Sequence, residues 1–307
     1  MELEIKQSLN LSEQELQLLD THSFLNILNV LSGEIYIAST YFATKNLLQA
    51  ALDKIQIVAA VLIYKDKFIE QLQKVDVCEH FVQETIETAC QQQPDYDVDK
   101  LNQSKENIAS IFAVFEIRAR EYLSRANTPE RWVLHGVPDL TNLYINVLKA
   151  IELNSHGRYR ILFNIAQQRD TDYFVCLKID SYNHKMIFMP PVIQDVFRDL
   201  IANARKYTPV GGKIEAGIYE SHNSLHLVVE DNGCGIPEHQ VEKVAQFGFR
   251  ADNVLEHSTK GGGFGLTKAF FVTKQFNGRM WIKSVLNKGT RISICIPIPQ
   301  LKTPNYA

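Results

Sequence analysis

The apolar residues in the first half of the chain recur at the spacing of amphipathic helices. Leu101, Ile108, Phe115 and Tyr122 lie seven residues apart, and Ile111 lies on the neighbouring ridge of the same helix. A seam with this repeat is typical of a helix that packs lengthwise against other helices. The pattern therefore predicts a helical bundle in this part of the chain.

Residues 11 to about 156 contain only two glycines, and their other signals fit an all-helical region. Ser12 followed by Glu15 forms the capping-box pattern that opens a helix. Polar residues and proline at 91–100 (QQQPDYDVDK) predict a loop, and 127–139 predicts a second break. We expect about four or five helices in this region.

After about residue 157 the pattern changes to short strands, glycine-rich loops and two helices. Leu225, Leu227 and Val229 alternate with their neighbours as in a strand with one buried face. The expected strands are 160–165, 173–179, 185–188, 213–219, 225–230, 279–285 and 291–296, and the expected helices are 191–207 and 265–276. Strands and helices mixed without regular alternation predict an α+β sandwich. We therefore expect an all-helical domain at 1–156 and an α+β domain at 157–307.

Composition and charge narrow the class of protein. The 307 residues are 45% hydrophobic and 22% charged, as in globular proteins and unlike disordered chains. The net charge of −3 argues against nucleic-acid binding through phosphate contacts. The sequence shows no apolar run of about 18 residues and no secretory signal, so we expect no membrane segment. The five cysteines are scattered, which predicts reduced thiols and a cytoplasmic protein.

Three segments of the second half carry residues suited to nucleotide binding. In the first, Asp199, Asn203 and Lys206 would share one face of the helix expected at 191–207. A carboxylate, an amide oxygen and an ammonium group suit Mg²⁺ and phosphate. The alternative is a polar helix face that is simply solvated.

The second segment, 230–237 (EDNGCGIP), follows a strand, and the third, 260–267 (KGGGFGLT), opens a helix. Asp231 can accept a hydrogen bond from the amino group of a base, and Gly233 and Gly235 let the backbone approach a ligand. An ordinary tight turn is the alternative. The N–H groups at the start of the helix in the third segment can hold phosphates. That segment matches neither the dinucleotide fingerprint nor a phosphate loop ending in GKS or GKT.

In this order, the three segments resemble the N, G1 and G2 boxes of the GHKL ATPases, the family of gyrase, MutL and histidine kinases. Residues 247–250 (FGFR) resemble the F box of histidine kinases. Residues 287–290 (NKGT), with the apolar strand after them, resemble the G3 segment. The resemblance covers about residues 158–299. It implies the GHKL (Bergerat) α/β sandwich, with ATP and Mg²⁺ as ligands.

The resemblance also implies roles for the matching residues. Asn203 would ligate Mg²⁺, Lys206 would contact phosphate, and Asp231 would pair with the adenine amino group. Residues 247–260 would form a mobile lid. The implied nucleotide-binding residues are Asn203, Lys206, Tyr207, Asp231, Gly233, Gly235, Phe249, Lys260, Gly261, Gly263, Gly265, Leu266 and Thr290.

Asp199 departs from the histidine-kinase pattern. Histidine kinases usually have asparagine at this position, whereas the hydrolytic members of the family have an acidic residue. The resemblance therefore makes Asp199 a candidate second metal ligand or a base that activates water. Simple ATP hydrolysis stays open as an alternative.

His22 is the candidate phosphate acceptor. It would lie on a polar stripe of the first helix with Asn26, opposite Leu19 and Val30. The segment HSFLN resembles the H box of histidine kinases, in which the residue matching Asn26 orients water for phosphatase activity on a regulator. Ser23 replaces the usual acidic neighbour, and this departure bears on the base for autophosphorylation.

The resemblance as a whole implies a cytosolic two-component histidine kinase. It would phosphorylate His22 from Mg-ATP and pass the phosphoryl group to an aspartate of a response regulator receiver domain. The helical half would form a homodimeric four-helix bundle, with its surplus helices as a regulatory or docking insertion. Few residues precede His22, so we expect a separate sensory protein to act in trans. The alternatives are a GHKL ATPase or serine kinase, and a degenerate kinase that is a scaffold for regulators.

Overall fold

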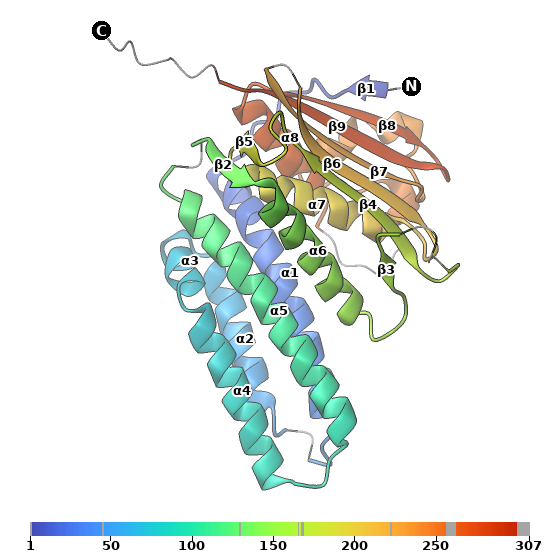
Figure 1. The fold of residues 1–307 in the computed structure, drawn as a ribbon. Coiled ribbons are helices and arrows are strands. Elements are labelled where there is room, and N and C mark those ends of the chain that lie inside the picture. Colours follow the sequence, from blue (N-terminus) through green and yellow to red (C-terminus); the bar gives the residue numbers. More distant parts are fainter. Residues whose placement is uncertain are drawn as a thin grey trace. The chain divides into compact units, whose positions relative to one another are not determined.

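The computed structural model describes residues 2–44, 46–128, 130–164, 166, 169–221, 223–255 and 262–299. The chain forms two compact units (Figure 1). One unit comprises residues 11–127, and the other comprises residues 1–10 together with residues 128–307. The boundary predicted between residues 156 and 157 therefore differs from the structure, in which the helical unit is inserted into the other unit.

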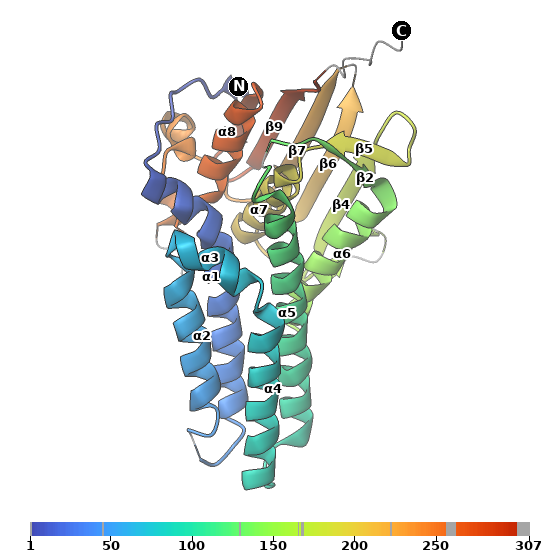
Figure 2. The same cartoon turned by 90° about the vertical axis from the view of Figure 1, so that its left-hand side faces the viewer.

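Within its described residues, the helical unit consists of four long helices that lie side by side and one short helix near one end (Figures 1 and 2). They are α1 (Glu13–Ser39), α2 (Gln49–Leu62), α3 (Lys65–Leu72), α4 (Val75–Gln92) and α5 (Val98–Arg125). The predicted capping box opens α1: the Ser12 hydroxyl accepts the Glu15 N–H, and the Ser12 N–H donates to the Glu15 carboxylate.

The predicted seam of α5 is buried inside the helical unit. Leu101, Ile108 and Phe115 are at most 2% exposed, and they share one core with Phe24 of α1 and Phe68 of α3. Burial of each such side chain stabilises the unit by about 1.5–3 kcal/mol. Because the seam packs within a single chain, it gives no argument for a second copy. The predicted homodimer is therefore supported by the family resemblance alone.

The other unit contains, among its described residues, a seven-stranded mixed sheet with the order β1-β8-β9-β7-β6-β4-β3. The β3–β4 and β4–β6 pairs are parallel, and the other neighbours are antiparallel. These strands are β1 (Glu2–Glu4), β3 (Ile161–Leu162), β4 (Tyr173–Asp180), β6 (Lys213–Ser221), β7 (Ser224–Asp231), β8 (Arg279–Val285) and β9 (Gly289–Pro297). Strands β2 (Val133–Gly136) and β5 (Met186–Met189) form a separate antiparallel pair.

Helices α6 (Val137–Leu153), α7 (Val192–Tyr207) and α8 (Gly265–Gln275) cover one face of this sheet (Figures 1 and 2). Among the described residues, short 3₁₀ helices lie at Glu238–Gln240, Lys243–Ala245 and Asp252–Val254. Along each central strand, alternate residues face the helices and are buried, as in Ile214, Ala216 and Ile218 of β6. The result is a two-layer α/β sandwich.

Strand β1 departs from the all-helical prediction for residues 1–156. It pairs antiparallel with β8, and the Glu4 carboxylate accepts two hydrogen bonds from the Arg279 guanidinium, at 2.9 and 2.6 Å. Ile5 follows and is 1% exposed in the core of the same unit. Strand β2 and helix α6 also belong to this unit, so the all-helical prediction was wrong at both ends of the region. Across the described residues, no helix has both the length and the apolar character that crossing a bilayer requires.

Candidate functional site

The predicted nucleotide-site residues come from α7, the end of β7 and the start of α8. Helix α7 places Asn203 against the first residue of α8, because a Cβ built on Gly265 would lie 2.6 Å from Asn203 Nδ2. A residue larger than glycine would have to displace this amide. The first turn of a helix presents N–H groups without intrahelical partners, which attract anions. An amide oxygen beside such a turn could be a ligand of a Mg²⁺ ion that is bound to the phosphate group.

Asp231 is a partly buried carboxyl group at the end of β7. Burial raises the pKa of Asp231 to about 6, although hydrogen bonds from the Gly233 and Thr290 N–H groups favour the charged form. The Gly233 nitrogen lies 2.8 Å from Asp231 Oδ1. The backbone thus fixes the direction of the carboxylate. A carboxylate has about four acceptor positions, so capacity remains for the amino group of a base.

The backbone turns beside Asp231 require glycine at two positions. A Cβ on Gly235, which has a φ of +65°, would overlap the Val285 carbonyl group. A Cβ on Gly289, which has a φ of +118°, would overlap the carbonyl oxygen of Asp231 itself. Glycine at these positions lets the backbone segments pack closely around the Asp231 turn.

Replacing Gly289 by alanine is therefore expected to destabilise the unit by about 2–4 kcal/mol, since the left-handed φ and the overlap with Asp231 both add strain. The matched control is Gly33→Ala in α1, where a Cβ would meet nothing within 4 Å. Helix propensity predicts that this control gains about 0.5–1 kcal/mol. Denaturant unfolding of both variants measures the two effects. A Gly289→Ala protein as stable as the wild type would contradict the close approach at Asp231.

Cationic side chains lie at the end of α7. Lys206 Nζ lies 5.1 Å from the centre of the Tyr207 ring. Desolvation, with Arg250 and Arg205 nearby, lowers the pKa of Lys206. Desolvation also raises the pKa of Tyr207. A bound anion would offset the repulsion between these cations, which supports a place for phosphate beside Lys206.

The start of the predicted lid contacts residues that follow the lid in sequence, at the start of α8. The rings of Phe247 and Phe264 lie 4.8 Å apart. Phe249 and Leu266 both pack against the core of the sheet. These contacts anchor the start of the lid, and the residues just after it, to the sandwich.

Close backbone and side-chain contacts also join the residues on the two sides of the predicted lid. Thr267 Oγ1 donates to the Gln246 carbonyl oxygen at 2.9 Å. Gly263 has a φ of +74°, and a Cβ there would lie 2.8 Å from the Gly248 carbonyl carbon. Lys260 and Gly261, which the resemblance places in the phosphate loop, lie outside the described residues.

A buried ion-pair cluster joins α7 and α8, and the sequence analysis missed its member Lys268. The Lys268 side chain is 5% exposed, and its Nζ lies 3.6 Å from Asp195 Oδ2 and 3.9 Å from Asp199 Oδ2. Asp195 also accepts a hydrogen bond from Arg198 Nη2 at 2.7 Å. Asp199, the candidate metal ligand or base, therefore lies within ion-pair distance of an ammonium group. The i, i+4 spacing of the two carboxylates is visible in the sequence, but it does not identify the cation that pairs with them.

In the helical unit, α1 carries the candidate phosphate acceptor. His22 is partly buried, and its Nε2 lies 3.1 Å from Asn26 Nδ2. This contact joins the two polar side chains of the predicted stripe. Asn26 is exposed as predicted. Val30 is 50% exposed, contrary to prediction, because the buried face of α1 is centred on Leu28 and Leu31.

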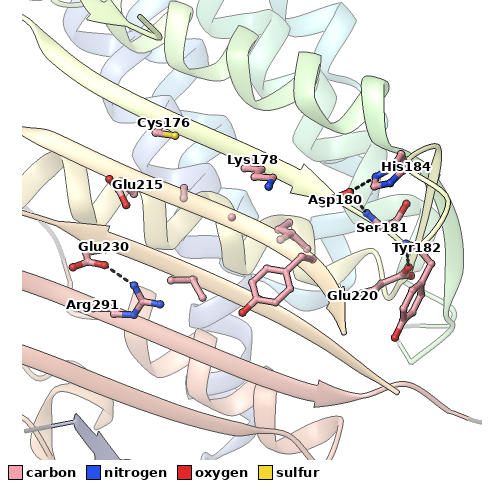
Figure 3. A pocket seen from close by; sticks show the side chains of 15 residues that line it. Cys176, Lys178, Asp180, Ser181, Tyr182, His184, Glu215, Glu220, Glu230 and Arg291 are labelled. Carbon is pink, nitrogen blue, oxygen red and sulfur yellow. Dashed lines mark hydrogen bonds and ion pairs between the residues drawn. The ribbon is translucent and has the colours of Figure 1, made fainter. Parts of the chain in front are cut away.

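The open face of the sheet holds a separate hollow of about 660 Å³ (Figure 3). Four of its charged or titratable side chains form two pairs: Arg291 Nη1 lies 2.6 Å from Glu230 Oε2, and His184 Nδ1 lies 2.6 Å from Asp180 Oδ1. Glu220 accepts the N–H groups of residues 182 and 188. The lining includes none of the predicted nucleotide-site residues, so this hollow is distinct from the nucleotide site.

Comparison with known sequences finds a family match over the part of the chain that contains α7, β7 and α8. Residues 190–300 match the family described as histidine kinase-, DNA gyrase B- and HSP90-like ATPase. The sensor protein kinase WalK of Staphylococcus aureus is 32% identical over 112 residues, which are 36% of this chain and 27% of that relative. WalK of strain JH9 matches with the same identity over 18% of its length. The match thus spans about a quarter or less of these curated relatives.

Solved structures of histidine kinases are also similar to part of the chain. The catalytic domain of histidine kinase ThkA is 18% identical with a TM-score of 0.40, and the match covers 54% of this chain and 95% of that one. The mycobacterial sensor histidine kinase MprB is 17% identical with a TM-score of 0.39, covering 55% and 100%. The family match and the curated relatives confirm the resemblance to sensor histidine kinases. The predicted fold class, a helical region with a GHKL-like α/β ATPase domain, is also confirmed.

Proposed function

We propose that this chain is a histidine kinase that transfers the γ-phosphoryl group of Mg-ATP to His22 and then to an aspartate of a response regulator receiver domain. The observation that carries the proposal is the assembly of the Asp231 carboxylate, the Asn203 amide and the first turn of α8 in one unit. The Cys234 N–H donates to the Tyr207 carbonyl oxygen at 3.0 Å, which ties the Asp231 turn to the end of α7.

Each part of this site would bind one part of ATP. Asp231 would accept a hydrogen bond from the adenine amino group. Lys206 would attract the phosphates, and the N–H groups of the first turn of α8 would hold them. Mg²⁺, with the Asn203 amide oxygen as a ligand, would supply neutralisation of the phosphate charge. The protein's own contribution is thus to position the nucleotide.

His22 would be the nucleophile of the transfer. A bond forms between His22 Nε2 and the γ-phosphorus as the bond to the leaving oxygen of ADP breaks. Attack requires the lone pair of a ring nitrogen that carries no proton, so Nε2 would have to leave its contact with the Asn26 amide before it reacts. By the resemblance, Asn26 would orient a water molecule that attacks the phosphoryl group on the aspartate of the bound regulator and releases inorganic phosphate. Ser23 offers no carboxylate to stabilise the charge that develops on the ring.

Simple ATP hydrolysis is the runner-up function, since Asp199 is acidic as in the hydrolytic family members. The position of Lys268 counts against it, because the Asp199 carboxylate lies 3.9 Å from this ammonium group. An ion pair directs the carboxylate to the ammonium and away from a water molecule. The kinase therefore remains the better supported function.

The partners and the cellular location are also part of the proposal. We propose a response regulator receiver domain as the partner, and the family resemblance supports it. The homodimer and a separate sensory protein in trans stay predictions, and we include neither a nucleic acid nor a membrane among the partners. All five cysteines are free thiols, which supports a cytoplasmic location.

Incubation of the chain with Mg²⁺ and γ-labelled ATP tests the proposed function. The expected product is a labelled protein whose label is acid-labile and alkali-stable, and an added receiver domain should remove that label. Release of phosphate without labelled protein would indicate an ATPase. Acid-stable label would indicate a serine kinase, and ATP binding without either product would indicate a scaffold.

A further inference from the structure

Lys268 is a buried cation at the phosphate-facing end of α8. The residue is 4% exposed, and it lies in the helix's first turn, where the partial positive charge of the helix dipole disfavours an ammonium group. Burial of an unpaired charge costs several kcal/mol, so such a lysine persists only with anionic partners. Asp195 and Asp199 are these partners, at 3.6 and 3.9 Å.

Both carboxylates lie on one face of α7. Asp195 and Asp199 are four residues apart, so their side chains project toward the same strip of α8. Asp195 is held in turn by Arg198, whose side chain is 2% exposed and lies 2.7 Å away. The cluster therefore joins two helices by charge pairs that water reaches poorly.

The cluster lies one helical turn from the contact that would place the phosphates. Gly265 is three residues before Lys268, and a Cβ built on it would lie 2.6 Å from the Asn203 amide nitrogen. Asn203 is four residues after Asp199 on α7. A change in the Lys268–Asp199 distance therefore changes the spacing between the Asn203 amide and the first N–H groups of α8.

We propose that Lys268 is a positioning residue of the nucleotide site, which clamps the first turn of α8 to α7 through Asp195 and Asp199 and so fixes the spacing between Asn203 and the phosphate-binding N–H groups. Asp199 is the carboxylate of this clamp and not a second metal ligand. The inference rests on the proposed nucleotide site.

The test measures two ligands that use different parts of the site. Mg-ATP needs the spacing between α7 and α8, whereas adenosine needs only the region of Asp231. Lys268→Met keeps the length of the side chain and removes its charge. We expect this variant to bind Mg-ATP about tenfold more weakly and adenosine within about twofold of the wild type. Lys268→Arg should restore most of the Mg-ATP affinity, because it restores the cation.

The Asp199→Asn variant distinguishes a role of Asp199 in the clamp from a role as a metal ligand. If Asp199 belongs to the clamp, the Mg²⁺ concentration that gives half-maximal ATP binding should stay within about twofold of the wild-type value. A rise of about tenfold or more would assign Asp199 to the metal and overturn the inference. Equal losses of Mg-ATP and adenosine in Lys268→Met would also overturn it, since they would indicate general disruption.

The stability of the chain provides a readout that does not depend on ATP. Denaturant unfolding of Lys268→Met, Asp199→Asn and the double variant forms a double-mutant cycle. We expect the double variant to lose less stability than the sum of the single variants, because removing one partner leaves the other as an uncompensated buried charge. Additive losses would overturn the clamp. Failure of the wild type to bind any nucleotide would overturn the proposed function instead, whatever the cycle shows.

Discussion

Replacing His22 by glutamine is expected to remove the acid-labile phosphoryl group from the chain completely. Glutamine has nearly the length of histidine and can still contact Asn26, but its amide nitrogen is not a nucleophile. The proposed transfer forms a nitrogen–phosphorus bond at Nε2, so no acceptor remains in the variant. The measurement is the yield of acid-labile label after incubation with Mg²⁺ and γ-labelled ATP.

The matched control for this variant is His80→Gln. His80 is also a helical histidine, and it pairs with Glu84 at 3.1 Å on the exposed surface of α4. The control should keep the full wild-type yield of label. ATP affinity of both variants is measured beside the label, so that a lost nucleotide site is not mistaken for a lost acceptor. Full labelling of His22→Gln would place the acceptor elsewhere and contradict the assignment.

The affinity for adenosine is expected to fall steeply below about pH 6. Burial raises the pKa of Asp231 to about 6, so its carboxyl group gains a proton as the pH drops through that value. The adenine amino group donates a hydrogen bond and needs the ionised carboxylate as its acceptor. Affinity should therefore fall about tenfold per pH unit below the pKa and stay constant above it. Adenosine is the probe because it lacks the phosphates, which titrate in the same range.

Asp231→Asn isolates the contribution of this carboxyl group. The variant should bind adenosine about 10–100-fold more weakly at neutral pH, because a hydrogen bond to a charged acceptor is lost. Its affinity should no longer depend on pH in this range. Calorimetric titrations at several pH values measure both effects. A wild-type affinity that is unchanged between about pH 5 and pH 8 would contradict a titrating Asp231 in the base site.

The same pKa fixes the sign of a stability effect. The folded-state pKa of Asp231 lies above its ordinary value of 3.8, so folding disfavours the charged form. The stability linked to this group is fully present below about pH 4 and is lost as the pH rises through about 6. At neutral pH the loss amounts to at most about 3 kcal/mol, and it offsets part of the stability of the ATPase fold. This loss of folding free energy arises because the ionised carboxylate stays partly buried, where it can bind a ligand.

The central strands and the helices beside them could be predicted from local patterns. The helix expected at 191–207 is α7 (Val192–Tyr207), and the strand expected at 279–285 is β8 (Arg279–Val285). These elements are long enough for their apolar periodicity to stand out. Strand β1 (Glu2–Glu4) could not be found in this way, because three residues have no periodicity and their order depends on pairing with β8.

The domain boundary was missed for a related reason. Helix α6 (Val137–Leu153) is amphipathic, and its pattern does not indicate which core its apolar face joins. In the structure Tyr144 of α6 packs edge-on against Phe197 of α7, with ring centres 5.1 Å apart. This contact places α6 in the ATPase unit, and only the tertiary structure shows it.

The proposed nucleotide site rests on motifs that are local in sequence and follow a fixed order. Asp231 and Gly265 lie in short glycine-rich segments that can be recognised from the sequence alone. Lys268 was not predictable, because a lysine in a helix usually faces solvent. Its burial becomes visible once α7 supplies two carboxylates to the same place.

The most direct test of the proposed kinase is the intact mass of the chain, measured at neutral pH before and after incubation with Mg-ATP. Neutral conditions matter because phosphohistidine is lost in acid. The proposed kinase predicts one added phosphoryl group per chain, on the peptide that contains His22, and its transfer to a receiver domain. An unmodified chain that nevertheless consumes ATP, or a phosphoryl group on a serine or threonine, would contradict it.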